Sequence, residues 1–209
     1  MIPASAPSRR RRTAPEARRV ILLAAEKRLA EGGPEAVRVA LVAADVGITD
    51  AAVHHHFGSR EGLLAALLRH CARKLRSEVA ASLAADATGT AGIRRAAERI
   101  AAIYWDGGAA RLALWLALSG EKPRGSGMYR PLVDAVQSVR VYRARTLGLA
   151  APRRESAQHA VALLNLALVG EPIHAGALLR SVDLPDEPAA RARFRRFLVD
   201  ALVRVLEEE

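Results

Sequence analysis

The chain has 209 residues and a mass of 22.4 kDa, and a chain of this length buries roughly 70% of its unfolded surface without covalent staples. Its single cysteine, Cys71, excludes an internal disulfide and a cysteine-based metal site, which predicts a reducing compartment. The longest apolar stretch, residues 160–169, is half as long as a bilayer requires, so we predict no membrane span and no membrane partner. The basic N-terminus does not run into the apolar core of a secretory signal, and we predict a cytoplasmic location.

The formal net charge of +10 is concentrated at the front of the chain. Residues 1–20 hold six arginines and one glutamate, whereas residues 21–80 hold eight basic and seven acidic side chains. Such a concentration of positive charge is typical of proteins that bind a polyanion, and it predicts a contact near the N-terminus. The alternative is a basic tail that only increases solubility.

The sequence pattern predicts an all-α protein of about nine helices. Ala, Leu, Arg and Glu recur at spacings of three and four, and no segment alternates long enough to form a strand. Thr13 and Glu16 form a capping box that opens a first helix over about residues 14–31, which the Gly-Gly-Pro sequence at 32–34 ends.

Two short helices and one long helix follow. The first short helix begins near Arg38 and ends at Gly47, and the second is opened by Thr49 and closed by Gly58. Ser59 then caps a long amphipathic helix of about 36 Å, which must join two regions of the protein.

Glycines and prolines divide the rest of the chain into five further helices. We expect them over about residues 91–105, 109–118, 128–147, 156–169 and 187–206, with the fourth interrupted at 170–172 and resuming at most to residue 179. One face of the last helix forms an apolar stripe that needs a partner surface, either in this chain or in another copy.

Two short helices that meet at Gly47, between a supporting helix and a long one, form a helix-turn-helix pattern, in which the second short helix enters the major groove of DNA. The run from Val39 to Leu64 includes the sequences Gly-Ile-Thr and His-Phe-Gly-Ser-Arg-Glu-Gly-Leu-Leu. Over about residues 16–78, this part of the chain resembles the DNA-binding domain of the TetR family of bacterial transcriptional regulators. The later helices match that family only in number, order and length.

The residue types of this motif fit contact with DNA. Thr49 can cap the recognition helix or bind a phosphate, and the small Ala51 and Ala52 allow close approach to thymine methyl groups. His54 and His55 lie one turn further on, within reach of phosphates or base edges. The candidate DNA contacts are Arg9, Arg10, Arg11, Arg12, Arg38, Thr49, Asp50, Ala51, Ala52, His54, His55 and Arg60.

The resemblance implies roles for two of these residues. The position of His54 is usually a tyrosine that binds the DNA backbone, and Arg60 takes the place of a lysine that does the same. Because histidine is mostly neutral at pH 7, we expect DNA affinity to rise as the pH falls through about 6.5. Asp50 either stabilises the helix dipole, which we favour, or accepts a bond from a cytosine amine.

The three consecutive histidines do not predict a metal site. Neighbours one and two apart on a helix point in different directions, and no further ligand follows at helical spacing. We therefore predict no metal and no cofactor, and we expect His56 to pack or bond locally. The arginines at 9–12 are placed to reach a flanking groove or phosphates, as homeodomain arms do.

The resemblance also implies a division of the chain and a role for its C-terminal part. Residues 1–13 would be a basic flexible arm, residues 14–78 the helix-turn-helix domain with its recognition helix at about 49–56, and residues 79–209 a helical domain that binds a ligand and dimerises. The candidate ligand-pocket residues are Tyr104, Trp105, Trp115, Met128, Tyr129, Tyr142, Asn165 and His174, although core packing is the alternative for each and Asn165 could instead set the register of an interface. The candidate dimer residues are Leu163, Leu166, Phe194, Phe197, Leu198, Ala201, Leu202 and Val205.

These expectations predict a non-enzymatic, ligand-responsive regulator, most simply a repressor. A homodimer would bind an inverted-repeat operator in double-stranded DNA, and a small-molecule effector would release it by moving the long helix that begins at Arg60. Co-repression and activation remain open. The alternatives are an architectural DNA-binding protein without an effector, and a helical enzyme, for which the sequence offers no nucleophile with its base and no phosphate loop.

Overall fold

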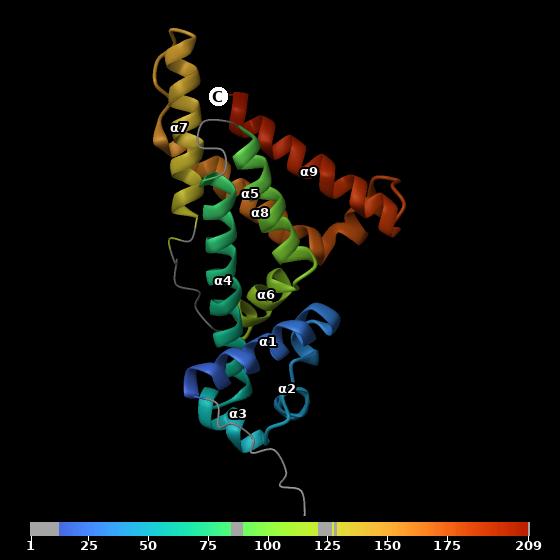
Figure 1. Ribbon diagram of the computed structural model, residues 1–209. Coiled ribbons are helices and arrows are strands. Elements are labelled where there is room, and N and C mark those ends of the chain that lie inside the picture. The colour runs from blue at the N-terminus through green and yellow to red at the C-terminus, as the bar shows by residue number, and fades with distance from the viewer. Residues whose placement is uncertain (1–12, 85–89, 121–126, 128, 209) are drawn as a thin grey trace, which may run out of the picture.

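The computed structural model describes residues 13–84, 90–120, 127 and 129–208, and within these residues every regular element is a helix. The elements are α1 (Ala14–Gly32), the 3-10 turn η1 (Pro34–Ala36), α2 (Val39–Val46), α3 (Asp50–Phe57), α4 (Arg60–Ala84), α5 (Thr90–Trp105), α6 (Ala109–Leu118), α7 (Arg130–Thr146), α8 (Arg154–Ser181) and α9 (Pro188–Glu208). The predicted all-α class is confirmed (Figure 1).

The N-terminal unit consists of α1, η1, α2, α3 and the start of α4, at the bottom of Figure 1. The predicted capping box is present, since the Thr13 N–H donates to Glu16 Oε2 at 2.8 Å and the Glu16 N–H donates to Thr13 Oγ1 at 3.4 Å. Gly47 ends α2 in the left-handed region with φ 71°, where a side chain would be strained. The turn between α2 and α3 therefore depends on this glycine.

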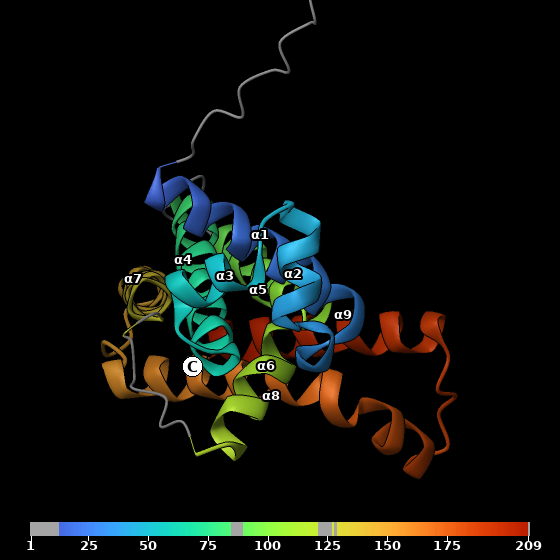
Figure 2. The same cartoon turned by 90° about the horizontal axis from the view of Figure 1, so that it is seen from below.

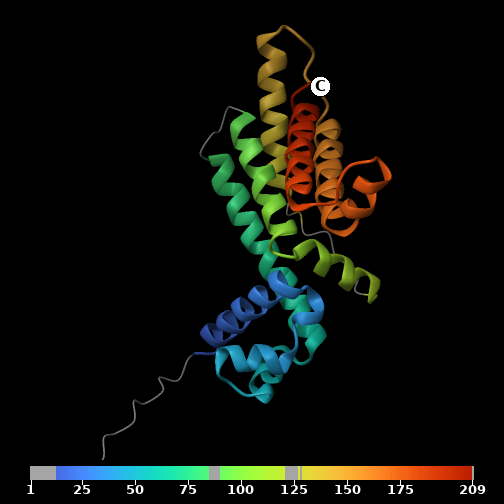
Figure 3. The same ribbon diagram turned by 90° about the vertical axis from the view of Figure 1, so that its right-hand side faces the viewer.

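The C-terminal helices form a bundle on top of the N-terminal unit, and α4 connects the two (Figure 3). α5 packs along α4 and also contacts α8 and α9, while α7 packs against α8. A single apolar core runs through both parts. Its fully buried large side chains are Ile21, Leu29, Leu63, Leu64, Leu67, Leu75, Ile93, Ile100, Leu112, Leu132, Leu164 and Leu168.

The expected interruption of α8 at residues 170–172 is wrong, because α8 continues through Pro172 to Ser181. Proline has no N–H to bond the carbonyl four residues earlier, which belongs to Leu168. The indole Nε1–H of Trp105 donates to that same carbonyl at 3.1 Å. A side chain from α5 thus satisfies the oxygen that Pro172 leaves free, and α8 bends rather than ends (Figure 2).

By length and composition alone, α8 could also cross a membrane. The same composition fits a core helix of a bundle, and α8 packs here against α5, α6, α7 and α9. Its buried face carries Leu164 and Leu168 together with the carboxylate of Glu171, which is ion-paired with Arg195. We therefore interpret α8 as a bundle helix with one partly exposed apolar face.

Replacing Trp105 with Phe should destabilise the fold by about 1–3 kcal/mol, because the Leu168 carbonyl then lacks a partner. In a Pro172→Ala background the cost should shrink, since an alanine at this position supplies the missing backbone N–H. Thermal or denaturant unfolding of the four proteins of this double-mutant cycle measures the difference. Equal costs of Trp105→Phe in the two backgrounds would show that Trp105 does not compensate for the proline.

Candidate functional site

The helix α3 presents a small, polar face to solvent. Asp50, Ala51, His54 and His55 are exposed, whereas the apolar Val53 of the same helix is buried against the core. In Figure 1 α3 lies at the end of the N-terminal unit that faces away from the C-terminal bundle. A nucleic acid could therefore reach this face without meeting the rest of the chain.

Thr49 acts as the N-cap of α3, since its Oγ1 accepts the N–H of Ala52 at 3.2 Å. The capping role predicted for Thr49 is therefore present in the structure. Ala52 is half-buried, so of the two adjacent alanines it is Ala51 that offers its methyl group to solvent.

Two arginines of α1 fix the positions of the short helices. Arg18 Nη1 donates to the His56 carbonyl at the end of α3 at 2.5 Å, and its Cζ lies 4.3 Å from the Phe57 ring centroid. Arg28 holds Asp45 at the end of α2 through two bonds of 2.5 and 2.8 Å, and this pairing lowers the pKa of the Asp45 carboxyl. Neither contact could be predicted from the sequence, because a single charge on a helix does not reveal which distant carbonyl or carboxylate it will meet.

His54 makes a local contact that restricts its chemistry. Its Nδ1 lies 3.0 Å from the Gly58 carbonyl, which can only accept a hydrogen bond. Nδ1 must therefore carry a proton, and in the neutral ring Nε2 is then an acceptor. Only the doubly protonated ring can donate from Nε2 to a phosphate.

The side chain of Arg60, which we expect to contact a phosphate, makes its contacts within the protein in this structure. Its Nε donates to the Val37 carbonyl at 3.0 Å, and its Nη2 donates to the Pro34 carbonyl at 2.7 Å. Its Cζ also lies 5.3 Å from the ring centroid of Trp115 on α6. The side chain points back into the protein because two carbonyls and an aromatic ring compete with solvent for the guanidinium.

The other candidate DNA contacts have a simpler environment. Arg38 precedes α2 as its N-cap, is exposed, and donates from Nε to the Glu35 carbonyl at 3.4 Å. The exposed Asp50 lies in the first turn of α3, where a negative charge favours the helix dipole. The arginines at 9–12 lie outside the described residues.

Three of the candidate ligand-pocket residues come together in the bundle. Asn165 Oδ1 accepts the Tyr104 hydroxyl at 2.8 Å and the Tyr129 hydroxyl at 2.5 Å, and the two hydroxyls also contact each other. Burial raises the pKa of both tyrosines. The cluster joins α5, the segment before α7, and α8, so it places hydrogen-bonded polar atoms in a partly buried region of the bundle.

The remaining pocket candidates are separated from this cluster. Trp115 contacts the N-terminal unit instead, through Arg60 and a bond from Nε1 to Glu35 Oε1 at 3.1 Å. Tyr142 and His174 are exposed, so their assignment to an enclosed pocket is not supported by their surroundings. Met128 lies outside the described residues.

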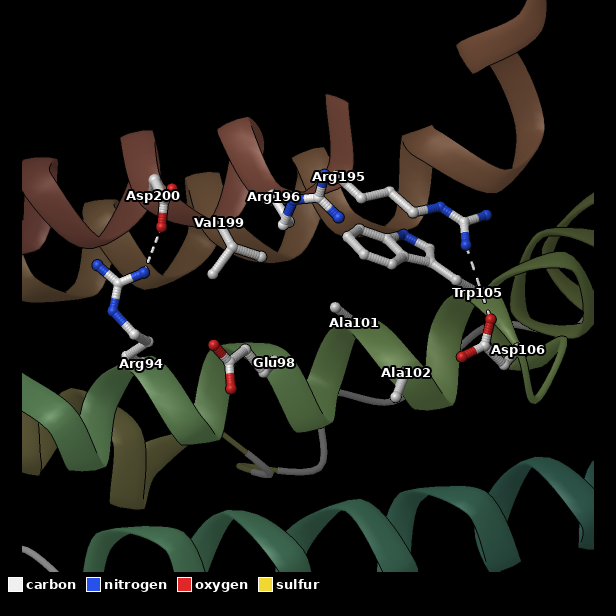
Figure 4. Close-up of a pocket in the computed structure, with 10 residues that line it drawn as sticks. All are labelled: Arg94, Glu98, Ala101, Ala102, Trp105, Asp106, Arg195, Arg196, Val199 and Asp200. Atoms are coloured by element: carbon white, nitrogen blue, oxygen red, sulfur yellow. Dashed lines mark hydrogen bonds and ion pairs between the residues drawn. The ribbon is translucent and has the colours of Figure 1, made fainter. Parts of the chain in front are cut away.

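A charged cleft of about 380 Å³ lies between α5 and α9 (Figure 4). Trp105 forms part of its wall, with Arg195 Cζ 4.7 Å from the ring centroid. Arg195 also donates to the buried Glu171 at 2.9 Å and pairs with Asp106 at 3.6 Å. Trp105 was a predicted pocket residue, but the arginines and acids around it could not be predicted, because they come from helices that are distant in the sequence.

Several of the candidate dimer residues are exposed. Leu166 on α8 and Phe197 on α9 are about two-thirds exposed, and Leu163 on α8 and Val205 on α9 are a little under half exposed. Three others, Phe194, Leu198 and Ala201, are half-buried, and the side chain of Leu202 lies outside the described residues. Among the residues that the structure describes, no three histidine, cysteine, aspartate or glutamate side chains gather to form a metal site.

Comparison with known proteins identifies the N-terminal unit. Residues 21–67 match the family model of bacterial regulatory proteins of the tetR family. No curated protein matches the chain.

Solved structures extend the similarity to the whole fold. A TetR-family transcriptional regulator from Pectobacterium atrosepticum is 20% identical, with a TM-score of 0.57 and 94% of each chain covered. A protein from work on the control of antibiotic production by bacterial hormones is 22% identical, with a TM-score of 0.65, 91% of this chain and 95% of that chain covered. AibR, solved in complex with isovaleryl coenzyme A and operator DNA, is 16% identical, with a TM-score of 0.52, 90% of this chain and 96% of that chain covered.

The predicted resemblance is thus confirmed where the sequence motif lies. The family model spans α3 and most of the elements that position it, and the arrangement of the later helices is that of the solved proteins. Residues 21–67 thus match the helix-turn-helix part of the tetR family of bacterial regulatory proteins, and the described chain has a fold similar to that of a solved TetR-family regulator.

Proposed function

We propose that this chain is a non-enzymatic transcriptional regulator that binds double-stranded DNA through α3. The observation that carries the proposal is the exposed face of α3, with Ala51, His54 and His55, on a helix that Arg18 fixes from α1. This face belongs to a TetR-type helix-turn-helix, in which the second helix enters the major groove. A DNA-binding role also fits the cytoplasmic location that we expect.

We further propose that the active form is a homodimer joined through α8 and α9. These helices pack on each other and expose Leu163, Leu166, Phe197 and Val205 to solvent. Two copies related by a two-fold axis would cover these side chains with the same side chains of the partner. Two recognition helices would then face an inverted-repeat operator.

The helical part of the chain, residues 79–209, would bind a small-molecule effector that releases the dimer from its operator. The polar cluster of Tyr104, Tyr129 and Asn165 supports this role, because a few polar atoms among apolar side chains are typical of ligand pockets. AibR has the same fold and has been solved with both an acyl coenzyme A and operator DNA. An occupied operator would block transcription, so we favour a repressor.

DNA binding by the purified protein tests the main proposal. We expect the protein to bind the DNA upstream of its own gene about a thousandfold or more tightly than scrambled DNA of equal length. Fluorescence anisotropy at two salt concentrations measures both affinities. The double variant His54→Ala, His55→Ala should lose most of this preference but keep its fold, because both side chains are exposed.

Equal and steeply salt-dependent binding to both DNAs would contradict sequence reading by α3. It would favour an architectural DNA-binding protein, which has little sequence preference. A matched control is His159→Ala on α8, which removes an exposed histidine from a helix far along the chain. This control should bind both DNAs as the unchanged protein does.

DNA affinity should rise several-fold as the pH falls from 8 to 6 at constant salt. Protonation adds a donor at His54 Nε2, whereas the neutral ring uses its one N–H on the Gly58 carbonyl. His54→Tyr should remove much of this pH dependence, because a phenol hydroxyl donates throughout this range. The matched control is His55→Gln, which removes the neighbouring ring and should leave the pH dependence due to His54 in place. A DNA affinity that does not change between pH 6 and 8 would contradict the proposed role of His54.

Leu166→Glu on α8, or Phe197→Glu on α9, should shift the protein from dimer to monomer. Both side chains are about two-thirds exposed in the single chain, at 70% and 67%, and a charge there would be buried in the dimer. We expect the dimer dissociation constant to rise tenfold or more, measured by light scattering after size exclusion. Leu118→Glu on α6, at an 80% exposed leucine, is the matched control. Unchanged dimers in both α8 and α9 variants would rule out this interface.

A further inference from the structure

Arg60 lies at the boundary between two parts of the molecule. It is the first residue of α4, three positions after the end of α3, so its backbone lies beside the proposed DNA-reading helix. Its side chain nevertheless runs to η1 and α6, and is only 26% exposed. An arginine that could reach a phosphate is thus held by contacts within the protein.

Two of these contacts occupy one bonding edge of the guanidinium. Arginine forms a bidentate contact with a phosphate through one of two edges, either Nε with Nη2 or Nη1 with Nη2. In Arg60, Nε is bonded to the Val37 carbonyl and Nη2 to the Pro34 carbonyl. These two bonds occupy the edge formed by Nε and Nη2, so Arg60 must leave the two carbonyls before it can bind a phosphate through that edge. Nη2 also lies 3.5 Å from Glu35 Oε2, and the negative charge of this carboxylate disfavours a phosphate at the remaining edge.

A second layer of contacts links this arrangement to α6. The Trp115 ring lies next to the guanidinium, and Trp115 Nε1 donates to Glu35 Oε1 at 3.1 Å. The other oxygen of Glu35 lies 3.5 Å from Arg60 Nη2. Trp115, Glu35 and Arg60 therefore close a three-membered contact, which we call the α6 clamp, between the bundle and η1.

The α6 clamp connects to the polar cluster through a short, tightly packed stretch of chain. Tyr104 lies near the end of α5, and only Asp106 to Gly108 separate α5 from α6. Gly108 has φ 69°, and a Cβ there would lie 2.8 Å from the Leu29 carbonyl of α1. The start of α6 is thus pressed against α1, so a displacement of α6 must alter its contacts with the N-terminal unit.

From this geometry we infer that Arg60 is a two-position residue that either closes the α6 clamp or binds a DNA phosphate. While the α6 clamp is closed, Arg60 does not contact a DNA phosphate. Displacement of α6 opens the clamp and allows Arg60 to bind a phosphate at the DNA-binding face. This inference rests on the proposed DNA binding and adds a specific element through which the bundle can change DNA affinity.

The test uses the salt dependence of binding to a duplex of arbitrary sequence, so it requires neither the operator nor the effector. Each additional phosphate contact steepens the slope of log K against log salt by about 0.9. Trp115→Ala should therefore raise the affinity several-fold at low salt and steepen the slope by about that amount. In an Arg60→Gln background the same Trp115 change should leave the slope unaltered.

A second variant guards against loss of folding in Trp115→Ala. Glu35→Ala changes an exposed side chain and should shift the slope in the same direction through the freed Arg60. Glu31→Ala is its matched control, because it removes a nearby exposed acid that pairs with Lys27 and not with Arg60. Leu118→Ala is the control on α6, and melting temperatures establish that each variant is folded.

The outcomes separate this inference from the proposed function. A steeper slope that disappears with Arg60→Gln supports the two-position residue. Two results would overturn the inference while the proposed function stands, provided that the unchanged protein binds DNA. In the first, Trp115→Ala and Glu35→Ala leave the salt slope unaltered. In the second, they change the slope by the same amount in the Arg60→Gln background. If the unchanged protein binds no duplex at all, both are overturned.

Discussion

An eight-residue helix is too short to be stable by itself, and the DNA-reading role proposed here depends on one such helix, α3. Its apolar residues Val53 and Phe57 anchor it in the core, and Thr49 caps its first turn. Arg18 satisfies a carbonyl at its other end, where four carbonyls lack partners within a helix. Because the buried and terminal residues of α3 fix its position, its exposed residues are not needed for packing and can contact DNA.

Because α3 depends on its neighbours for its position, a change in the packing of those neighbours can move it. The helix is joined to α4 by only two residues, and α4 continues into the bundle as part of one unbroken core. Within the described residues, one apolar core therefore extends from the proposed reading helix to the helices that surround the polar cluster. A change of packing in the bundle can reach α3 along α4 or across the contact of α6 with η1.

Much of this could be predicted from the sequence, because the signals were local. The capping box at Thr13, the left-handed Gly47 and the motif that follows it each act within a few residues, and the predicted helices that they delimit are present. The continuity of α8 could not be predicted in this way, because the partner that makes Pro172 tolerable, Trp105, lies 67 residues earlier in the chain.

The candidate site shows the same division between local and distant information. The exposed face of α3 follows from helical spacing, but the inward turn of Arg60 depends on Trp115, which is 55 positions away. Among the pocket candidates, residue type alone did not distinguish Tyr129, which joins the partly buried polar cluster, from Tyr142, which is exposed. Such distinctions need the tertiary contacts, since aromatic side chains suit a core, a pocket and an interface equally well.

Hydrogen–deuterium exchange of the full chain, with and without a saturating DNA duplex, tests most directly that α3 is the surface that meets DNA. The account predicts slower exchange for the amides of residues 49–60 when DNA is present, since bound DNA shields this face and stabilises a short helix. Bound DNA that leaves the exchange of residues 49–60 unchanged, while slowing that of the C-terminal bundle, would contradict it.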